Sequence, residues 1–247
     1  MLNSIELKEK LNNIIKEKKT NLCFSADFTK SFELIYWIEL TAPYICILKT
    51  HIDILEDFEY SIIEKIKELS IRYNFLIFED RKFGDIGKTF EKQLYGGIYK
   101  IGLWADIISI HGICANGMLS YINSLPNNIK KPSILIISQM SSINNLITDE
   151  YSLNCFNVAL KYKNLVLGFI SQNRFIEDMS THKFLFISPG IRLEKQTLLD
   201  QQYRNHKDAI LRDKNDLIIL GSCIYSDKEP KNILSKLKNE SYNFYAN

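Results

Sequence analysis

The feature that most constrains the fold of this chain is a series of eight short apolar runs, which alternate with longer amphipathic segments. Most of the runs are apolar at consecutive positions, as is typical of parallel strands that are buried on both faces. The runs are Asn21–Ser25, Tyr44–Leu48, Phe75–Phe78, Asp106–Ile110, Ile134–Ile137, Leu165–Phe169, Phe184–Ile187 and Leu217–Leu220. Their alternation with amphipathic segments predicts an α/β fold with a parallel sheet.

Helices are predicted between these runs. The segment Leu55–Tyr73 places five large apolar side chains on one helical face. The segments Thr89–Trp104 and Tyr151–Lys161 show a weaker form of the same pattern. Eight strands separated by helices favour a (β/α)8 TIM barrel. A doubly wound open sheet is the competing fold, but no G-x-G-x-x-G follows the first run.

The same pattern predicts that residues 1–247 form one barrel domain, since no linker or internal repeat divides them. The first 20 residues read as an amphipathic lead-in helix. This helix and the tail Pro230–Asn247 are expected to close the two ends of the barrel.

Composition excludes several classes of protein. The chain has 31 Lys and Arg against 29 Asp and Glu, so it lacks the basic excess of a general nucleic-acid coat. It shows neither a long uncharged apolar stretch nor a signal peptide, so we expect no membrane partner and a cytoplasmic location. Its five cysteines are widely spaced without a C-x-x-C, which predicts reduced thiols and neither disulfides nor a zinc site.

Polar residues follow the apolar runs, where the catalytic residues of such a barrel lie. They include Lys49 after the second run and the D-x-K-x-x-D motif of Asp80, Lys82 and Asp85 after the third. A lysine held among carboxylates stays protonated and can deliver a proton to a carbon that becomes basic during a reaction. A surface network of salt bridges explains this spacing equally well.

Two longer stretches carry a family resemblance. Residues 48–55 (LKTHIDIL) and 78–89 (FEDRKFGDIGKT) resemble orotidine 5′-phosphate decarboxylase of the eukaryotic type, including the decarboxylase half of animal UMP synthase. Shorter similar segments before and after them stand in the family's order, so the resemblance covers roughly residues 20 to 225. The resemblance implies a homodimeric (β/α)8 barrel with shared active sites. It also implies conversion of orotidine 5′-phosphate to UMP, the last step of de novo pyrimidine nucleotide synthesis, without a metal or an organic cofactor.

The resemblance also implies roles for individual residues. Lys49, Asp80, Lys82 and Asp85 match the catalytic charge network, in which Lys82 would protonate C6 of the pyrimidine and Asp80 would face the departing carboxylate. Asp85 would reach into the partner's site together with Ile86 and Thr89. The remaining substrate contacts would be Ser25 and Pro189 in the pocket, Asp27 and Lys49 at the ribose, Ser141 at the pyrimidine edge, and Gln201, Tyr203, Gly221 and Ser222 at the phosphate.

One departure from the family concerns the phosphate. The family has Gly-Arg after the eighth strand, whereas this chain has Gly221-Ser222. Replacing a bidentate guanidinium by a hydroxyl predicts a weaker hold on phosphate. Two features are expected to compensate: Arg192, which is a substrate contact in bacterial members, and backbone N–H groups if a short helix starts after Gly221.

This departure leaves alternatives open. One is an impaired or inactive relative that binds a nucleotide or a protein partner. Another is a Mg²⁺-dependent barrel enzyme with a D-x-K-x-x-D motif, which Lys49-Thr50-His51 and Gln201-Gln202-Tyr203 argue against.

The four histidines are not expected to act as catalytic bases. His51 is interpreted as a positioned structural residue, and His111 is expected outside the site. His182 and His206 are predicted to be exposed loop residues.

Overall fold

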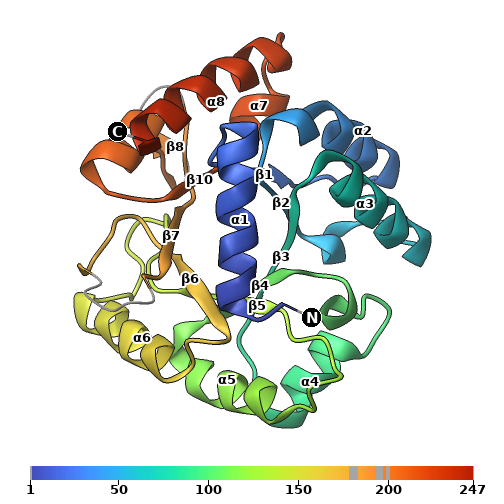
Figure 1. Cartoon of the computed structure of the whole chain (residues 1–247), viewed down its shortest axis with the longest axis vertical. Coiled ribbons are helices and arrows are strands. Elements are labelled where there is room, and N and C mark those ends of the chain that lie inside the picture. The colour runs from blue at the N-terminus through green and yellow to red at the C-terminus, as the bar shows by residue number, and fades with distance from the viewer. Residues whose placement is uncertain (1, 178–182, 193–196, 199–200, 247) are drawn as a thin grey trace.

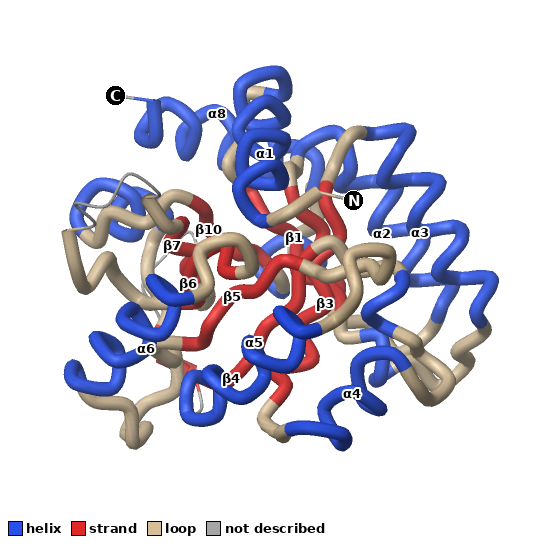
Figure 2. The backbone as a smooth tube through the Cα atoms, turned by 60° about the horizontal axis from the view of Figure 1, so that its bottom comes forward, coloured by secondary structure: helices blue, strands red, loops and turns tan. Residues whose placement is uncertain are grey.

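The computed structural model describes residues 2–177, 183–192, 197–198 and 201–246. Eight parallel strands close into a barrel, in which β1 pairs with both β2 and β10 (Figures 1 and 2). The strands are β1 (Leu22–Ala26), β2 (Ile47–Thr50), β3 (Leu76–Phe83), β4 (Ile107–His111), β5 (Ser133–Ile137), β6 (Val166–Ile170), β7 (Leu185–Ser188) and β10 (Leu217–Leu220). Each of the eight apolar runs overlaps a strand, although β2 begins only at Ile47 in the run Tyr44–Leu48, and the predicted TIM barrel is confirmed.

Helices surround the barrel, as Figure 2 shows. They are α1 (Ser4–Lys18), α2 (Ser31–Thr41), α3 (Tyr60–Tyr73), α4 (Gly87–Tyr95), α5 (Ala115–Ser124), α6 (Asp149–Lys161), the π-helix η5 (Asp208–Arg212), α7 (Ser222–Tyr225) and α8 (Pro230–Ala246). Short 3₁₀ turns are η1 (Ala42–Tyr44), η2 (Ile52–Ile54), η3 (Ile101–Leu103) and η4 (Gly112–Cys114). A two-stranded ribbon, β8 (Thr197–Leu198) and β9 (Gln201–Gln202), precedes η5. Within the described ranges, no helix is both long and apolar enough to span a membrane.

Two predicted helices have different bounds from those expected. The helix expected from Leu55 begins at Tyr60, because η2 and a turn occupy the residues before it. The helix expected over residues 89–104 ends at Tyr95, where Gly96 and Gly97 follow, and only the short η3 continues the pattern. Glycine loses much backbone entropy in a helix, so it favours such an end.

The residues of each strand alternate between two cores. Leu22 and Phe24 point outward into a core shared with the surrounding helices, while Cys23 points into the barrel. The inward core also contains Ile47 and Phe78. Because side chains alternate along a strand, these three inward series continue two residues later with Ser25, Lys49 and Asp80 at the carboxyl end of the barrel.

The opposite end of the barrel is covered by α1, which lies across it in Figure 1. Leu7, Leu11 and Ile14 of α1 join the inward core, so this predicted closure is confirmed. The helix begins with a capping box, in which the Asn3 side chain accepts from the Glu6 amide and the Glu6 carboxylate accepts from the Asn3 amide.

The expected role of the tail is wrong. Helix α8 does not close an end of the barrel but lies in its outer ring, in contact with α2, α7 and η5. It follows the eighth barrel strand, β10, and so takes the place that a helix has after each strand of a (β/α)8 fold.

Candidate active site

A cavity of about 740 Å³ opens at the carboxyl ends of the strands. This volume is within the range of small-molecule sites. The cavity brings together eleven of the residues predicted from the sequence: Ser25, Asp27, Lys49, Asp80, Lys82, Ser141, Pro189, Arg192, Tyr203, Gly221 and Ser222.

Four other predicted residues are not placed in the cavity. Asp85, Ile86 and Thr89 lie outside its lining, and the Asp85 carboxylate accepts a hydrogen bond from the Ile86 amide at 2.8 Å. Ile86 is 61% exposed. Gln201 lies in β9, but its side chain is outside the described part of the structure.

Asp80 lies at the centre of a compact charge cluster on the cavity floor. Its Oδ2 is 2.6 Å from the Lys82 ammonium and 3.2 Å from the Lys49 ammonium. Lys49 also lies 3.5 Å from Oδ1 of Asp27, and Ser25 donates to the other oxygen of Asp27 at 2.8 Å. Two cations and two anions therefore alternate across adjacent strand ends.

Asp80 and Lys82 are two residues apart in β3, so strand alternation directs both side chains into the cavity, and the strand bulges beside them. The register of β3 against β4 shifts between Glu79 and Phe83, and Lys82 adopts a left-handed backbone conformation with φ of 53°. A non-glycine residue held in this region commonly marks a functional site. The surface-network interpretation of the D-x-K-x-x-D motif does not fit Asp80, which is 7% exposed.

Ser109 of β4 supports this bulge and was missed from the sequence. Its hydroxyl donates to Asp80 Oδ1 at 2.6 Å and accepts from the Lys82 amide at 3.1 Å. The available signal was a serine two residues after Ile107, on the inward side of an otherwise apolar run.

The cluster sets the ionisation of its members. Burial alone would raise the pKa of Asp80, but the charges of Lys49 and Lys82 outweigh it and lower the pKa to about 2. Burial likewise opposes the charged form of Lys49, yet Asp80 and Asp27 hold its pKa above the usual value. Asp80 and Lys49 therefore both stay charged at neutral pH.

His51 lies beside this cluster and lines the cavity. Its Nε2 is 2.7 Å from the Lys49 ammonium. Burial, followed by the charge of Lys49, lowers the pKa of His51, so the neutral ring accepts a hydrogen bond from the ammonium. Its hydrogen bond with Lys49, together with the 3.5 Å distance of its Nε2 from Asp80 Oδ2, fits a positioning role.

The other histidines differ in burial. His111 lies outside the cavity lining, as expected. His206 was predicted to be an exposed loop residue, and this is wrong. It is 7% exposed because its ring pairs with Glu240 of α8 at 2.8 Å and packs on Phe244. His182 lies outside the described residues.

Glu79 is a second residue that sequence reasoning missed. It is fully buried behind Asp80, where it accepts from the Thr50 hydroxyl at 2.7 Å and from the Ile52 amide at 3.1 Å. Burial raises the pKa of Glu79 to about 8, against the lowering effect of those two donors. With His51 and Asp53 it forms a group of three possible metal ligands among the described residues. Glu79 and His51 already accept hydrogen bonds from protein donors, so we do not assign a metal site to this group.

Glu79 predicts a measurable pH dependence of stability. Between the unfolded pKa of 4.5 and the folded pKa of about 8, the folded state holds a proton that the unfolded state has released. The contribution of Glu79 is therefore fully present below pH 4.5 and is lost as the pH rises towards 8. We expect the free energy of unfolding of Glu79→Gln, measured in urea, to fall less between pH 5 and 8 than that of wild type. Equal slopes for the two proteins would contradict this.

Arg192, which follows β7, and Ser222, which follows β10, meet in the lining of the cavity. Gly190 adopts φ of 73°, and two residues later the Arg192 guanidinium stacks 4.2 Å above the Tyr203 ring. Its Nη2 donates to the Ser222 hydroxyl at 3.2 Å. Helix α7 begins at Ser222, so the short helix expected after Gly221 is present. The position without the family arginine thus has a guanidinium beside it, supplied from the end of another strand.

Comparisons with known proteins show the family of this chain. The family model described as orotidine 5′-phosphate decarboxylase / HUMPS family matches residues 20–237. The chain belongs to this family. It is 40% identical over 219 residues to the orotidine 5′-phosphate decarboxylase of Saccharomycopsis fibuligera, covering 87% of this chain and 83% of the relative. It is 38% identical over 221 residues to that of Kluyveromyces marxianus, covering 88% and 82%.

Solved structures of other proteins support the barrel fold of this chain. The orotidine 5′-phosphate decarboxylase of Pyrococcus horikoshii matches with a TM-score of 0.65 at 17% identity, covering 92% of this chain and 99% of the other. That of Lactobacillus acidophilus matches with a TM-score of 0.61 at 19% identity, covering 90% and 99%. At these identities the likeness concerns the barrel alone.

Proposed function

We propose that this chain decarboxylates orotidine 5′-phosphate to UMP, the last step of de novo pyrimidine nucleotide synthesis. The observation that carries the proposal is the cluster of buried Lys49 and Asp80 with the partly exposed Lys82, in a cavity of nucleotide size. Family membership and the yeast relatives support the same activity. The impaired or inactive relative is not favoured, because both lysines and the aspartate stand in contact.

The cluster suits the chemistry of this reaction. When the bond between C6 and the carboxylate breaks, the electron pair stays on C6, and CO₂ leaves. The Lys82 ammonium would stabilise that charge and then transfer a proton to C6. Asp80 would lie against the substrate carboxylate, where its negative charge favours departure of CO₂. Because the cations are already ordered around Asp80, little reorganisation accompanies the reaction.

The remaining cavity residues would place the substrate. Asp27 and Lys49 would bind the ribose hydroxyls, and Ser141 the pyrimidine edge. The phosphate would lie at the opposite side of the cavity, where a guanidinium makes charge-assisted hydrogen bonds to phosphate oxygens. The residues proposed there are Arg192, Gln201, Tyr203, Gly221 and Ser222, with Ser25 and Pro189 in the adjoining wall.

A homodimer with shared sites would complete the cavity. Asp85, Ile86 and Thr89 lie outside the lining of one subunit, so a partner subunit would supply them. Exposed apolar side chains on this surface support its burial against a second subunit, since Ile86 is 61% exposed and Ile113 is 84% exposed. Sedimentation equilibrium at micromolar concentration is expected to give twice the chain mass. A stable monomer that retains full activity would contradict this proposal.

Two observations support the proposed domain organisation and cellular location. Packing of α1 into the inward core and of α8 into the outer ring supports one domain over residues 1–247, which predicts a single cooperative unfolding transition. All five cysteines are free thiols, which supports a reducing, cytoplasmic location. Two separate transitions, or recovery of the protein in an oxidising compartment, would contradict these two proposals.

A direct assay tests the function. Purified protein is incubated with orotidine 5′-phosphate in the presence of EDTA, and UMP formation is followed. We expect full turnover, since the proposed chemistry uses only side chains of the chain. Absence of UMP would overturn the proposal, and loss of turnover with EDTA alone would point instead to a metal-dependent reaction.

A further inference from the structure

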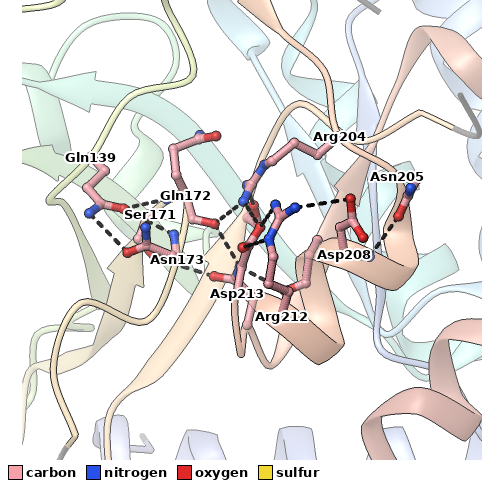
Figure 3. Close-up of polar contacts among 12 residues, drawn as sticks. Gln139, Ser171, Gln172, Asn173, Arg204, Asn205, Asp208, Arg212 and Asp213 are labelled. Atoms are coloured by element: carbon pink, nitrogen blue, oxygen red, sulfur yellow. Dashed lines mark hydrogen bonds and ion pairs between the residues drawn. The ribbon is translucent and has the colours of Figure 1, made fainter. Parts of the chain in front are cut away.

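A chain of polar contacts runs from the end of β5 to the segment beyond β9 (Figure 3). It starts at Gln139, whose side-chain oxygen accepts from the amides of Gln172 at 2.8 Å and Asn173 at 3.1 Å. The Gln139 amide group donates to the Asn173 side chain at 3.3 Å. These contacts join the residues that follow β5 to those that follow β6.

Arg204 continues the contacts. Its guanidinium donates to the backbone oxygen of Gln172, to the carboxylate of Asp213 and to the hydroxyl of Ser188. The side chains of Arg204 and Asp213 are only 14% and 10% exposed. A buried charge is tolerated when it is paired and hydrogen-bonded. One guanidinium therefore ties the ends of β6 and β7 to the residue that follows η5.

The backbone of Arg204 reaches the phosphate side of the cavity. Its amide donates to the Gly190 oxygen at 2.9 Å, and its own oxygen accepts from the Arg192 amide at 2.9 Å. This bridge fixes Tyr203 next to Arg192, whose guanidinium stacks on the Tyr203 ring. Arg204 itself does not line the cavity.

The other end of the contact chain reaches the pyrimidine side. Gln139 lines the cavity and directly precedes Met140 and Ser141, which line it too. We propose that Gln139, Gln172, Arg204 and Asp213, here called the polar belt, couple the pyrimidine side of the cavity to the phosphate side. In this role Arg204 is a positioning residue that acts through Arg192 and Tyr203. The inference rests on the proposed function and adds a reason why phosphate binding assists a reaction at C6.

The belt makes a prediction that depends on the substrate. Binding energy from a remote group raises the rate only when the protein transmits it to the reacting centre. We expect Arg204→Gln to lower kcat/KM for orotidine 5′-phosphate by about 10- to 30-fold, with kcat affected as well as KM. For orotidine, which has no phosphate, the loss is expected to stay below about 3-fold.

A matched control separates positioning from general stability. Arg174 forms another partly buried pair, with Asp216 at 2.9 Å, and its guanidinium also stacks on Phe186. Its side chain contacts neither Gln139 nor Arg204 among the described residues. Arg174→Gln is expected to lower the melting temperature while changing kcat/KM for the two substrates equally.

Further variants keep the test decisive if Arg204→Gln does not fold. Arg204→Lys keeps a cation beside Asp213 but lacks the fork that reaches three acceptors, so it should show a smaller loss in the same direction. Gln139→Ala interrupts the belt at its other end, and the double variant with Arg204→Lys should lose less than the product of the single losses.

The outcomes distinguish the two proposals. If wild type forms no UMP, the proposed function fails. Suppose instead that wild type is active and the Arg204 and Gln139 variants lose the same factor in kcat/KM for both substrates. In that case, or if the loss of the double variant equals the product of the single losses, the belt is only structural and this inference is overturned.

Discussion

Replacing Lys82 with alanine is expected to lower kcat/KM for orotidine 5′-phosphate by about 10²- to 10⁴-fold, the usual contribution of a positioned general acid. The ammonium lies 2.6 Å from Asp80, so its removal also takes away a cation that holds this carboxylate ionised. UMP formation at pH 7 measures the loss.

Two controls accompany this variant. Lys82→Gly removes the same side chain but accepts φ of 53° more easily than alanine, so it should be more stable than Lys82→Ala and equally inactive. Lys65→Ala, at a surface pair with Glu68, should keep wild-type activity. A Lys82→Ala enzyme within 3-fold of wild type would exclude Lys82 as the proton donor.

Replacing Arg192 with alanine is expected to lower kcat/KM for the same substrate by about 10- to 150-fold. A hydrogen bond to a charged group contributes about 1.5–3 kcal/mol, which corresponds to this range. Since this chain has Ser222 where the family has arginine, Arg192 would be the cation held there by the Tyr203 ring and the Ser222 hydroxyl.

Orotidine provides the internal control for Arg192→Ala, because it lacks the group that the guanidinium would bind. Its kcat/KM should change little. Arg192→Lys should recover part of the loss, since it keeps the charge without the planar fork. An equal loss with both substrates would mean that Arg192 acts on the loop structure, and no loss would mean that phosphate is bound elsewhere.

The strands of this barrel were predictable because each is buried on both faces and therefore apolar over consecutive residues. The ends of the helices were less predictable. The helix expected to begin at Leu55 begins at Tyr60, because η2 and a turn occupy the residues before it. The burial of His206 depends on Glu240 and Phe244 of α8, which pattern reasoning could not place beside it.

The supporting residues of the site were also hidden. Ser109 and Glu79 lie within or next to apolar runs, where a single polar residue has no distinctive spacing. Their importance comes from neighbours on adjacent strands: Asp80 and Lys82 for Ser109, and Thr50 for Glu79. Strand pairing decides which residues become neighbours, and a local pattern does not contain it.

The sequence by itself determined the barrel and the charged residues at its carboxyl end, because both follow from local periodicity and from the order of residues after each strand. Only the tertiary structure decided how the side of the cavity that is proposed to bind phosphate is built. The contact between Arg192 and Ser222 joins residues 30 positions apart, and that between Arg204 and Gln172 joins residues 32 apart. Such contacts form only when closure of the barrel brings its strand ends together.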